Sequence, residues 1–315
     1  MNLLAQARRL SELGVLGLNE RNGDYISVFN PRHLYPLVDD KLRTKELALQ
    51  AGMAVPELYG TVHTDHEAEH LEQLLEGRDN FVIKPATGSG GDGILVVAER
   101  KRDDRFRLIG GQIIRLGELK YHVSNILSGQ YSLGGNQDAA IIEYCVRFDP
   151  LFDPISYLGV PDIRIIVYRG YPAMAMVRLP TRQSHGKANL HQGAVGAGID
   201  MLSGRTTTAV LGNEPVDEHP DTGAPIAGVQ IPDWMGILEL AARCSDVVGL
   251  GYLGVDIVLD RDRGALILEL NARPGLNIQI ANGIGLKTRL RRIDAVADES
   301  QDYRQRAALA VELGE

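Results

Sequence analysis

Cysteine is scarce in this sequence, and long apolar runs are missing from it. Only two of the 315 residues are cysteine, Cys145 and Cys244, too few for the disulfide framework of small secreted domains. No apolar stretch approaches the ~20 residues of a membrane-spanning helix, and the first residues lack the uninterrupted apolar core of a signal peptide. We therefore expect a cytoplasmic protein with no membrane insertion.

An excess of positive charge is also missing. The sequence has 33 Lys and Arg against 41 Asp and Glu, a net charge of −8, and no basic stripe that would favour nucleic acid as a partner. Its length suits two lobes. Strand and helix patterns mix irregularly along the chain, which favours the α+β class.

The first half of the chain predicts two helices and a strand–loop–strand unit. Asp39 and Asp40 can cap a helix over residues 41–50, and Thr64 with Glu67 forms a capping box for a second. Residues 81–85 and 94–97 are predicted strands on either side of a glycine-rich loop, residues 86–93 (ATGSGGDG). Because P-loop and Rossmann fingerprints need a helix after the loop, neither mechanism applies.

The second half predicts mainly strands. They cover residues 139–146, 162–168, 171–178, 253–260 and 265–270. A helix begins at Pro232 and ends at Gly249. Residues 203–231 are rich in Gly, Pro, Thr and Asp, and we expect them to be irregular rather than a regular element.

The last predicted hairpin brings two carboxylates together. If Asp260 pairs with Ala265, then Asp256 lies directly opposite Glu269, with Cβ atoms ~5 Å apart. Side chains alternate along a strand, so Asn271 points the same way as Glu269. Two close carboxylates in an apolar hairpin repel each other unless a cation holds them. Mg²⁺ suits such sparse protein ligation.

Cations are the second feature of interest. Lys84 precedes the glycine-rich loop, where backbone N–H groups and a fixed cation suit phosphate tails; the alternative is a plain hairpin loop. Arg164 and Arg178 lie in an adjacent strand pair, where a guanidinium could neutralise a transferring phosphoryl group or bind a substrate carboxylate. The alternative is pairing with acidic neighbours, and Asp256 and Glu269 could equally face solvent or pair with arginines such as Arg164.

One metal motif is better explained without a metal. His66-Glu67-Ala68-Glu69-His70 matches the H-E-x-x-H pattern of zinc proteases. Glu69 puts a charge inside the motif and the helix face looks solvated, whereas a zinc site needs a third ligand and a dry wall. We therefore do not expect a zinc protease.

In their order, these segments resemble the ATP-grasp superfamily over roughly residues 38–285. The resemblance is greatest to the α-L-glutamate ligase (RimK-like) branch and to related sugar-transfer-associated ATP-grasp proteins. The segments that carry it are residues 40–44 (DKLRT), 82–93, 142–146 (IEYCV), 162–164 (DIR), 187–190 (KANL), 254–256 (GVD) and 269–275 (ELNARPG).

The resemblance implies an α+β ATP-grasp fold whose two lobes hold ATP between them, with a reduced or absent N-terminal domain. It implies a short N-terminal segment (1–37), a smaller lobe (38–146), a larger lobe (147–300) and a C-terminal helix (301–315). The residues implied to bind ATP are Lys41, Lys84, Gly88, Ser89, Gly90, Gly91, Glu143, Tyr144, Cys145 and Asp162. Those implied to bind the metal are Asp256, Glu269 and Asn271. Those implied to serve the reaction are Arg164, Arg178, Lys187, Asn189 and Arg273.

The implied reaction joins a carboxylate to an amine through an acyl phosphate, on an amino acid or peptide. Its cofactors are ATP and Mg²⁺, as one ion or two, with Mn²⁺ as a substitute. The expected partners are a small-molecule or peptide carboxylate and an amine, and the chain could form a homo-oligomer. Two other function classes stay open, a catalytically silent ATP-binding regulatory protein and an ATP-dependent phosphotransferase.

Overall fold

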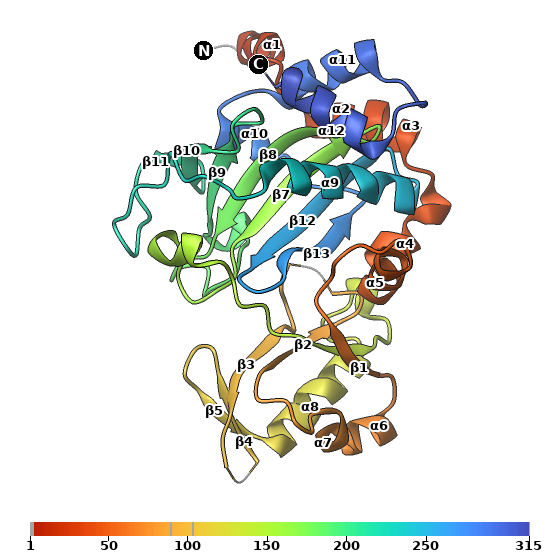
Figure 1. The fold of residues 1–315 in the computed structure, drawn as a ribbon, viewed down its shortest axis with the longest axis vertical. Coiled ribbons are helices and arrows are strands. Elements are labelled where there is room, and N and C mark those ends of the chain that lie inside the picture. Colours follow the sequence, from red (N-terminus) through yellow and green to blue (C-terminus); the bar gives the residue numbers. More distant parts are fainter. Residues whose placement is uncertain (1–2, 89, 103, 315) are drawn as a thin grey trace.

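The computed structural model describes residues 3–88, 90–102 and 104–314. They form two antiparallel sheets with helices packed against each, and this α+β arrangement confirms the predicted class. A six-stranded sheet lies at one end of the molecule and a seven-stranded sheet at the other (Figure 1). The helices α4 (Pro36–Asp39) and α5 (Lys41–Gln50) lie at their junction.

The smaller sheet has the strand order β1-β6-β2-β3-β4-β5. Its strands are β1 (Leu58–Val62), β2 (Phe81–Pro85), β3 (Leu95–Arg100), β4 (Arg105–Leu108), β5 (Ile113–Arg115) and β6 (Ala140–Glu143). Its helices are α6 (Asp65–Glu69), α7 (Leu71–Leu74) and α8 (Leu116–Leu127). Alternation along β2 buries Phe81 and Ile83 in a core shared with α8, so Lys84 points to the opposite face.

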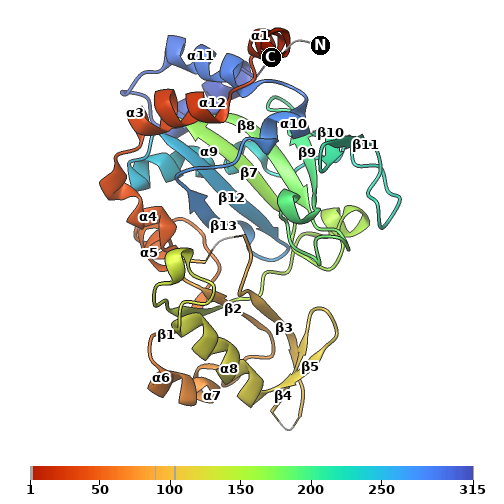
Figure 2. The same cartoon turned by 180° about the vertical axis from the view of Figure 1, so that it is seen from behind.

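The larger sheet has the strand order β11-β10-β9-β8-β7-β12-β13. Its strands are β7 (Asp162–Tyr168), β8 (Tyr171–Leu179), β9 (Val195–Ile199), β10 (Thr206–Leu211), β11 (Glu214–Val216), β12 (Tyr252–Asp260) and β13 (Gly264–Asn271). Helix α9 (Trp234–Val248) lies across one face and shares a core with Ile163 and Ile165 (Figure 1). Helices α10 (Asn277–Asn282) and α11 (Leu286–Val296) pack with Ile166 and Tyr168 on the other face (Figure 2). Helix α12 (Tyr303–Glu312) follows them.

The segment before α4 packs onto the larger sheet. It contains α1 (Leu3–Glu12), α2 (Leu18–Glu20), the π-helical η1 (Arg21–Ile26), α3 (Ser27–Phe29) and the 3₁₀ turn η2 (Arg32–Leu34). Asn30 accepts the N–H of Tyr252 at 2.8 Å and donates to the carbonyls of Tyr252 and Ala272 at 2.7 and 3.0 Å. Arg21 donates to the carbonyl of Pro274 at 2.7 Å. These bonds fix the start of β12 and the end of β13.

The helix boundaries follow the predicted signals. Asp40 accepts the N–H of Leu42 at 2.9 Å at the start of α5, and the capping box of Thr64 and Glu67 is formed at α6. Helix α9 ends at Gly249, whose φ of +69° is a left-handed conformation that glycine adopts readily. Within the described ranges, no helix is both long and apolar enough to cross a bilayer.

The prediction for residues 203–231 is wrong in part, because β10 and β11 form a hairpin there. Leu211 pairs with Glu214 across a two-residue turn, and β10 extends the larger sheet beside β9. Strand β10 begins with three threonines, residues 206–208. Threonine is β-branched and favours strands, but the overall composition of this segment had suggested a loop. Two predicted boundaries also shift: β6 ends at Glu143 rather than at residue 146, and α9 begins at Trp234.

The described residues also contain three further short 3₁₀ turns. They are η3 (Leu133–Gly135), η4 (Pro150–Ile155) and η5 (Leu190–Gln192). Of these, η5 matters for the site because it lies between β8 and β9, next to the predicted residues Lys187 and Asn189.

Candidate active site

Four strands of the larger sheet place charged side chains on one face. Arg164 of β7 lies opposite Asp256 of β12, which lies opposite Glu269 of β13. Asp162 of β7 lies opposite Arg178 of β8. Opposite residues on neighbouring strands share a face, and so do residues two apart on one strand. The five predicted site residues are therefore brought together.

The hairpin of β12 and β13 reaches this register in an unexpected way. Asp256 is opposite Glu269, as predicted, but Asp260 pairs with Gly264 rather than with Ala265. The register shifts by one residue just after Asp256, which is a β-bulge in which one strand carries an extra residue. The predicted pairing at the turn is thus wrong, and the bulge restores the predicted alignment at the site.

Asp256 lies at the centre of a buried ion cluster. Arg164 donates to both of its carboxylate oxygens, with Nη2 at 2.6 Å from Oδ2. Arg178 donates to Asp162 through Nε at 2.5 Å and Nη2 at 2.6 Å, and its Nη2 also lies 2.8 Å from Asp256 Oδ2. The Asp256 side chain is 1% exposed. The arginine pairing that the sequence left open for Asp256 is the one present in this structure.

Burial and the two guanidinium groups act in opposite directions on these carboxylates. Burial raises the pKa of Asp162 to about 6, although Arg178 opposes the rise. Burial also works against ionisation of Asp256, but Arg164 and Arg178 outweigh it and hold the pKa of Asp256 below its usual value. Burial disfavours the Arg178 cation, yet Asp162 and Asp256 raise its pKa above the usual range. Asp256 is therefore a carboxylate, held by charge, at neutral pH.

The donor set around Asp256 has the chemistry of a hard-cation site. Glu269 has a 30% exposed side chain and lies 3.1 Å from the ammonium of Lys41, and the amide nitrogen of Asn271 lies 3.4 Å from Asp256 Oδ2. Two carboxylates and an amide oxygen fit Mg²⁺, which binds through few protein oxygens. Across residues 3–88, 90–102 and 104–314, no group of three or more His, Cys, Asp or Glu gathers to hold a metal. A metal at this face would thus be bound sparsely.

The smaller sheet contributes a second buried ion cluster. Lys84 of β2 pairs with Glu143 of β6, its diagonal neighbour, because Val82 lies opposite Glu143. Lys45 of α5 lies 3.0 Å from the other oxygen of Glu143. Burial opposes ionisation of Glu143, but Lys84 and Lys45 together hold its pKa below the usual value. Lys45 was not predicted from the sequence, although it lies four residues after Lys41 on the same helix face.

The glycine-rich loop joins β2 to β3 of the smaller sheet and contacts side chains from the larger sheet. Lys41 donates to the Gly88 carbonyl and pairs with Glu269 of the larger sheet. Farther along the loop, Asp92 lies 3.0 Å from the ammonium of Lys187. The Gly90 carbonyl accepts from Asn189 at 3.2 Å and from Gln192 at 3.4 Å; a side chain at Gly91 (φ +80°) would come within 3.4 Å of Lys187. The predicted residue Ser89 lies outside the described residues.

The segment after β6 is fixed by backbone and side-chain contacts. The N–H of Tyr144 donates to the Glu57 carbonyl at 2.8 Å, and its hydroxyl donates to Asp260 at 3.0 Å. The guanidinium of Arg263 lies 4.0 Å above the Tyr144 ring. Burial raises the pKa of the Cys145 thiol to about 11, so this cysteine is a neutral thiol rather than a reactive nucleophile.

Arg273 and the histidines of the H-E-x-x-H motif make contacts outside the two ion clusters. Arg273 has a 56% exposed side chain that lies 3.6 Å from Asp39 and stacks 5.1 Å from the Tyr35 ring centroid. His66 lies in α6, and His70 follows the end of that helix with its Nδ1 at 3.0 Å from the His66 carbonyl. Both histidines are exposed.

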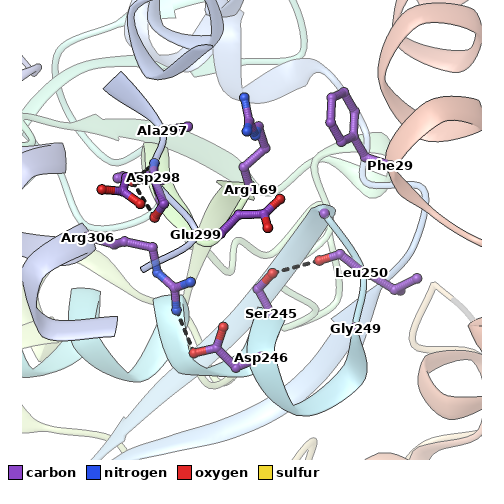
Figure 3. Close-up of a pocket in the computed structure, with 12 residues that line it drawn as sticks. Phe29, Arg169, Ser245, Asp246, Gly249, Leu250, Ala297, Asp298, Glu299 and Arg306 are labelled. Atoms are coloured by element: carbon purple, nitrogen blue, oxygen red, sulfur yellow. Dashed lines mark hydrogen bonds and ion pairs between the residues drawn. The ribbon is translucent and has the colours of Figure 1, made fainter. Parts of the chain in front are cut away.

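A separate pocket of about 390 Å³ lies beside the turn between β7 and β8 and the end of α9 (Figure 3). Arg306 and Asp246 form an ion pair at 2.5 Å on one side, and Arg169 and Phe29 line another. None of the predicted site residues lines this pocket, so it is not the candidate active site.

Comparisons with known proteins agree with this arrangement. The model of the sugar-transfer associated ATP-grasp family matches residues 20–295. Proteins described as probable alpha-L-glutamate ligases are 23% identical: one from Maridesulfovibrio salexigens, aligned over 86% of this chain and 64% of its own, and one from Aeromonas salmonicida, over 78% and 59%. This chain thus spans less than two thirds of the length of these curated relatives.

A solved structure of a RimK domain ATP-grasp protein from Sphaerobacter thermophilus is 14% identical to this chain. It aligns over 84% of this chain and 70% of that one, with a TM-score of 0.46. The family model covers most of this chain and includes both ion clusters and the glycine-rich loop. The chain therefore belongs to the sugar-transfer associated ATP-grasp family.

Proposed function

We propose that this protein is an ATP-dependent carboxylate–amine ligase that holds Mg-ATP between its two sheets. The observation that carries the proposal is the double contact of Lys41, whose ammonium touches both the Gly88 carbonyl and the Glu269 carboxylate. One cation thus joins the glycine-rich loop of one sheet to the carboxylate row of the other. A polyphosphate with its metal needs these two kinds of group close together.

The nucleotide would lie along the face that carries Lys84 and Glu143. Lys41, Lys84 and the loop residues Gly88, Ser89, Gly90 and Gly91 would hold the phosphates. Glu143 and the two residues that follow it, Tyr144 and Cys145, would face the adenine. Because the Tyr144 N–H already donates to Glu57, Cys145 is the better source of a backbone donor. Asp162 would face the ribose and orient Arg178, to which it is hydrogen-bonded.

Magnesium would be held by Asp256, Glu269 and Asn271. Bound there, as one ion or two, Mg²⁺ or Mn²⁺ would neutralise charge on the phosphates. Asp256 is now held by Arg164 and Arg178, so metal binding would require at least one guanidinium to turn away from it. A released guanidinium would then be free to bind a phosphoryl oxygen.

The proposed reaction has two steps. An oxygen of the substrate carboxylate attacks the γ-phosphorus of ATP, and the bond to the β-phosphate oxygen breaks to give an acyl phosphate and ADP. The amine then attacks the acyl carbon, expels phosphate and loses a proton to form the amide. Arg164, Arg178, Lys187, Asn189 and Arg273 would stabilise the charged oxygens, and closure of the glycine-rich loop would exclude water from the acyl phosphate.

The substrates would be an amino acid or peptide carboxylate and an amine, as the names of the glutamate ligase relatives suggest. Cys145 and Cys244 are both free thiols, which suits a cytoplasmic enzyme.

The decisive test is ADP release from Mg-ATP by the purified protein, across single amino acids and their pairs. Glu269→Gln removes one proposed metal-binding charge and should reduce the release at least ~100-fold, while leaving the fold intact. Amino-acid-dependent ADP with an amide product would support the ligase. A phosphate ester product would instead point to a phosphotransferase, and ATP binding without turnover to a silent binding protein. Unchanged turnover in Glu269→Gln would remove the metal proposal.

A further inference from the structure

Lys45 is a buried lysine for which the reaction above has no use. Its side chain is 6% exposed, and its ammonium contacts the carboxylate of Glu143 and the carbonyl of Pro56. Its helix packs through Ala48 into the core of the larger sheet, whereas Glu143 belongs to the smaller one. Lys45 therefore crosses from one sheet to the other.

Lys45, Glu143 and Lys84 form an ion trio with an excess of positive charge. The side chains of Glu143 and Lys84 are 3% and 5% exposed, so solvent screens the three charges little. Two ammonium groups share one carboxylate, and in the described part of the chain neither lysine pairs with another acidic side chain. A buried site with one uncompensated positive charge attracts an anion.

Glu143 pairs with both Lys45 and Lys84, and how its negative charge is shared between them decides how strongly Lys84 can bind that anion. While Lys45 neutralises part of the carboxylate, the Lys84 ammonium keeps charge for a phosphate. If Lys45 lost its charge, Glu143 would pair with Lys84 alone, and that pair would be neutral. The phosphate would then compete with Glu143 for the same ammonium.

We propose that Lys45 is a positioning residue for the polyphosphate. Through Glu143 it holds the Lys84 side chain in place, and it keeps the charge of the Lys84 ammonium available for phosphate. This inference rests on the proposed function, because Lys84 is there assigned to the phosphates. A purely structural role would be different. Loss of Lys45 would then lower stability but leave the phosphate affinity of the folded protein unchanged.

The test measures binding by titration calorimetry, with Mg-ATP and with adenosine as separate ligands. Lys45→Met keeps the length of the side chain and removes its charge, so it should weaken Mg-ATP binding about tenfold or more and leave adenosine binding unchanged. Lys45→Arg should recover much of the loss. The matched control is Lys120→Met, because Lys120 also contacts a carbonyl and a carboxylate, those of Glu69 and Glu72 in the helices beside the smaller sheet.

A second variant separates charge from packing. Lys45→Met combined with Glu143→Gln removes both charges that compete around Lys84 and should bind Mg-tripolyphosphate more tightly than Lys45→Met alone. Tripolyphosphate has no adenine, so any role of Glu143 at the base does not enter. If Lys45 served only in packing, the added Glu143→Gln substitution would not restore the affinity for tripolyphosphate.

The outcomes separate this inference from the function on which it rests. Wild-type protein that binds Mg-ATP, with Lys45→Met within about twofold of it, would overturn the role of Lys45 and leave the ligase proposal standing. Absence of Mg-ATP binding by the wild-type protein would overturn both.

Discussion

At the scale of single residues, Asp256 is a buried carboxylate that depends on neighbouring cations. Its carboxylate is almost fully buried and accepts hydrogen bonds from two arginines. Removing a carboxylate from water costs several kcal/mol, which the guanidinium groups offset only while the geometry is kept. The residue thus stabilises the cluster, and at the same time it is the one proposed to exchange arginine for metal.

Asp256→Asn should therefore destabilise the fold, because it leaves Arg164 and Arg178 buried without their shared charge. We expect a loss of about 3 kcal/mol in the free energy of unfolding, measured by urea denaturation. Glu269→Gln is the control, since the Glu269 side chain is 30% exposed and its ion pair with Lys41 should contribute ~1 kcal/mol or less. Equal losses in the two variants would contradict the central role of Asp256.

Site residues could be predicted where strand alternation alone decides the face. Glu269 and Asn271 fall on one face because the period of a strand is two residues. Asp256 joins them only through the bulge that follows it, which offsets the one-residue change of pairing at the turn. Lys45 could not be found in this way. In the helix KLRTKELALQ it looks like an ordinary surface lysine, and only the packing of that helix between two sheets buries it.

At the scale of elements, the glycine-rich loop is held by α8 at its far end. His122 of α8 bonds to the Gly93 carbonyl at 2.9 Å, and its ring lies 5.6 Å from that of Tyr131. A side chain at Gly93 would come within 2.6 Å of Tyr131. The loop therefore depends on a residue without a side chain at this point.

Gly93→Ala should lower the free energy of unfolding more than replacement of a left-handed glycine in open space does. Gly93 and Gly264 have nearly equal φ angles, +74° and +73°, but nothing lies within 4 Å of a side chain at Gly264. We expect ~1 kcal/mol for Gly264→Ala from backbone strain and about 2–3 kcal/mol for Gly93→Ala, where crowding is added. Urea denaturation of both variants tests the difference, and equal costs would mean that Tyr131 moves aside freely.

The same contact predicts a dependence on pH. Burial lowers the pKa of His122, so folding disfavours its protonated form. The stability that His122 contributes is complete above the unfolded pKa of ~6.5 and is lost as pH falls through the lower folded value. The unfolding free energy of wild type should thus fall more between about pH 7.5 and pH 5.5 than that of His122→Gln. If the unfolding free energies of the two proteins fall equally with pH, His122 is not the source of the pH dependence.

Elements could be predicted where a local signal dominates, as at the cap of α5 and the glycine that ends α9. Strand β10 shows the limit. Its threonines suit a strand, but a strand at that position is stabilised by its pairing with β9, which is a long-range contact that composition does not contain.

At the scale of the whole molecule, a few side chains join the two sheets. Lys45 and Lys41 reach across from α5, and Lys187 reaches from the larger sheet to Asp92. The last pair is exposed, and such pairs contribute little. A ligand that contacts both sheets would add further interactions to those that hold them together.

Mg-ATP should raise the melting temperature of the protein. At about 100 times Kd, a ligand that binds only the folded state adds ~2.7 kcal/mol, which thermal denaturation can detect. EDTA should abolish most of the increase if Mg²⁺ is part of the bound species, and Lys84→Met should reduce it. An increase that EDTA leaves unchanged would remove the metal from nucleotide binding.

The path of the chain through the smaller sheet affects how easily this sheet could be exchanged between related proteins. All of its strands come from residues 58–143, and the first and last of these, Leu58 and Glu143, are paired neighbours. The whole sheet is therefore encoded by one uninterrupted stretch of gene whose product begins and ends at the same point in space. We expect that relatives could exchange such a stretch as one unit, because its two junctions with the rest of the chain are adjacent and every strand of the larger sheet lies outside it.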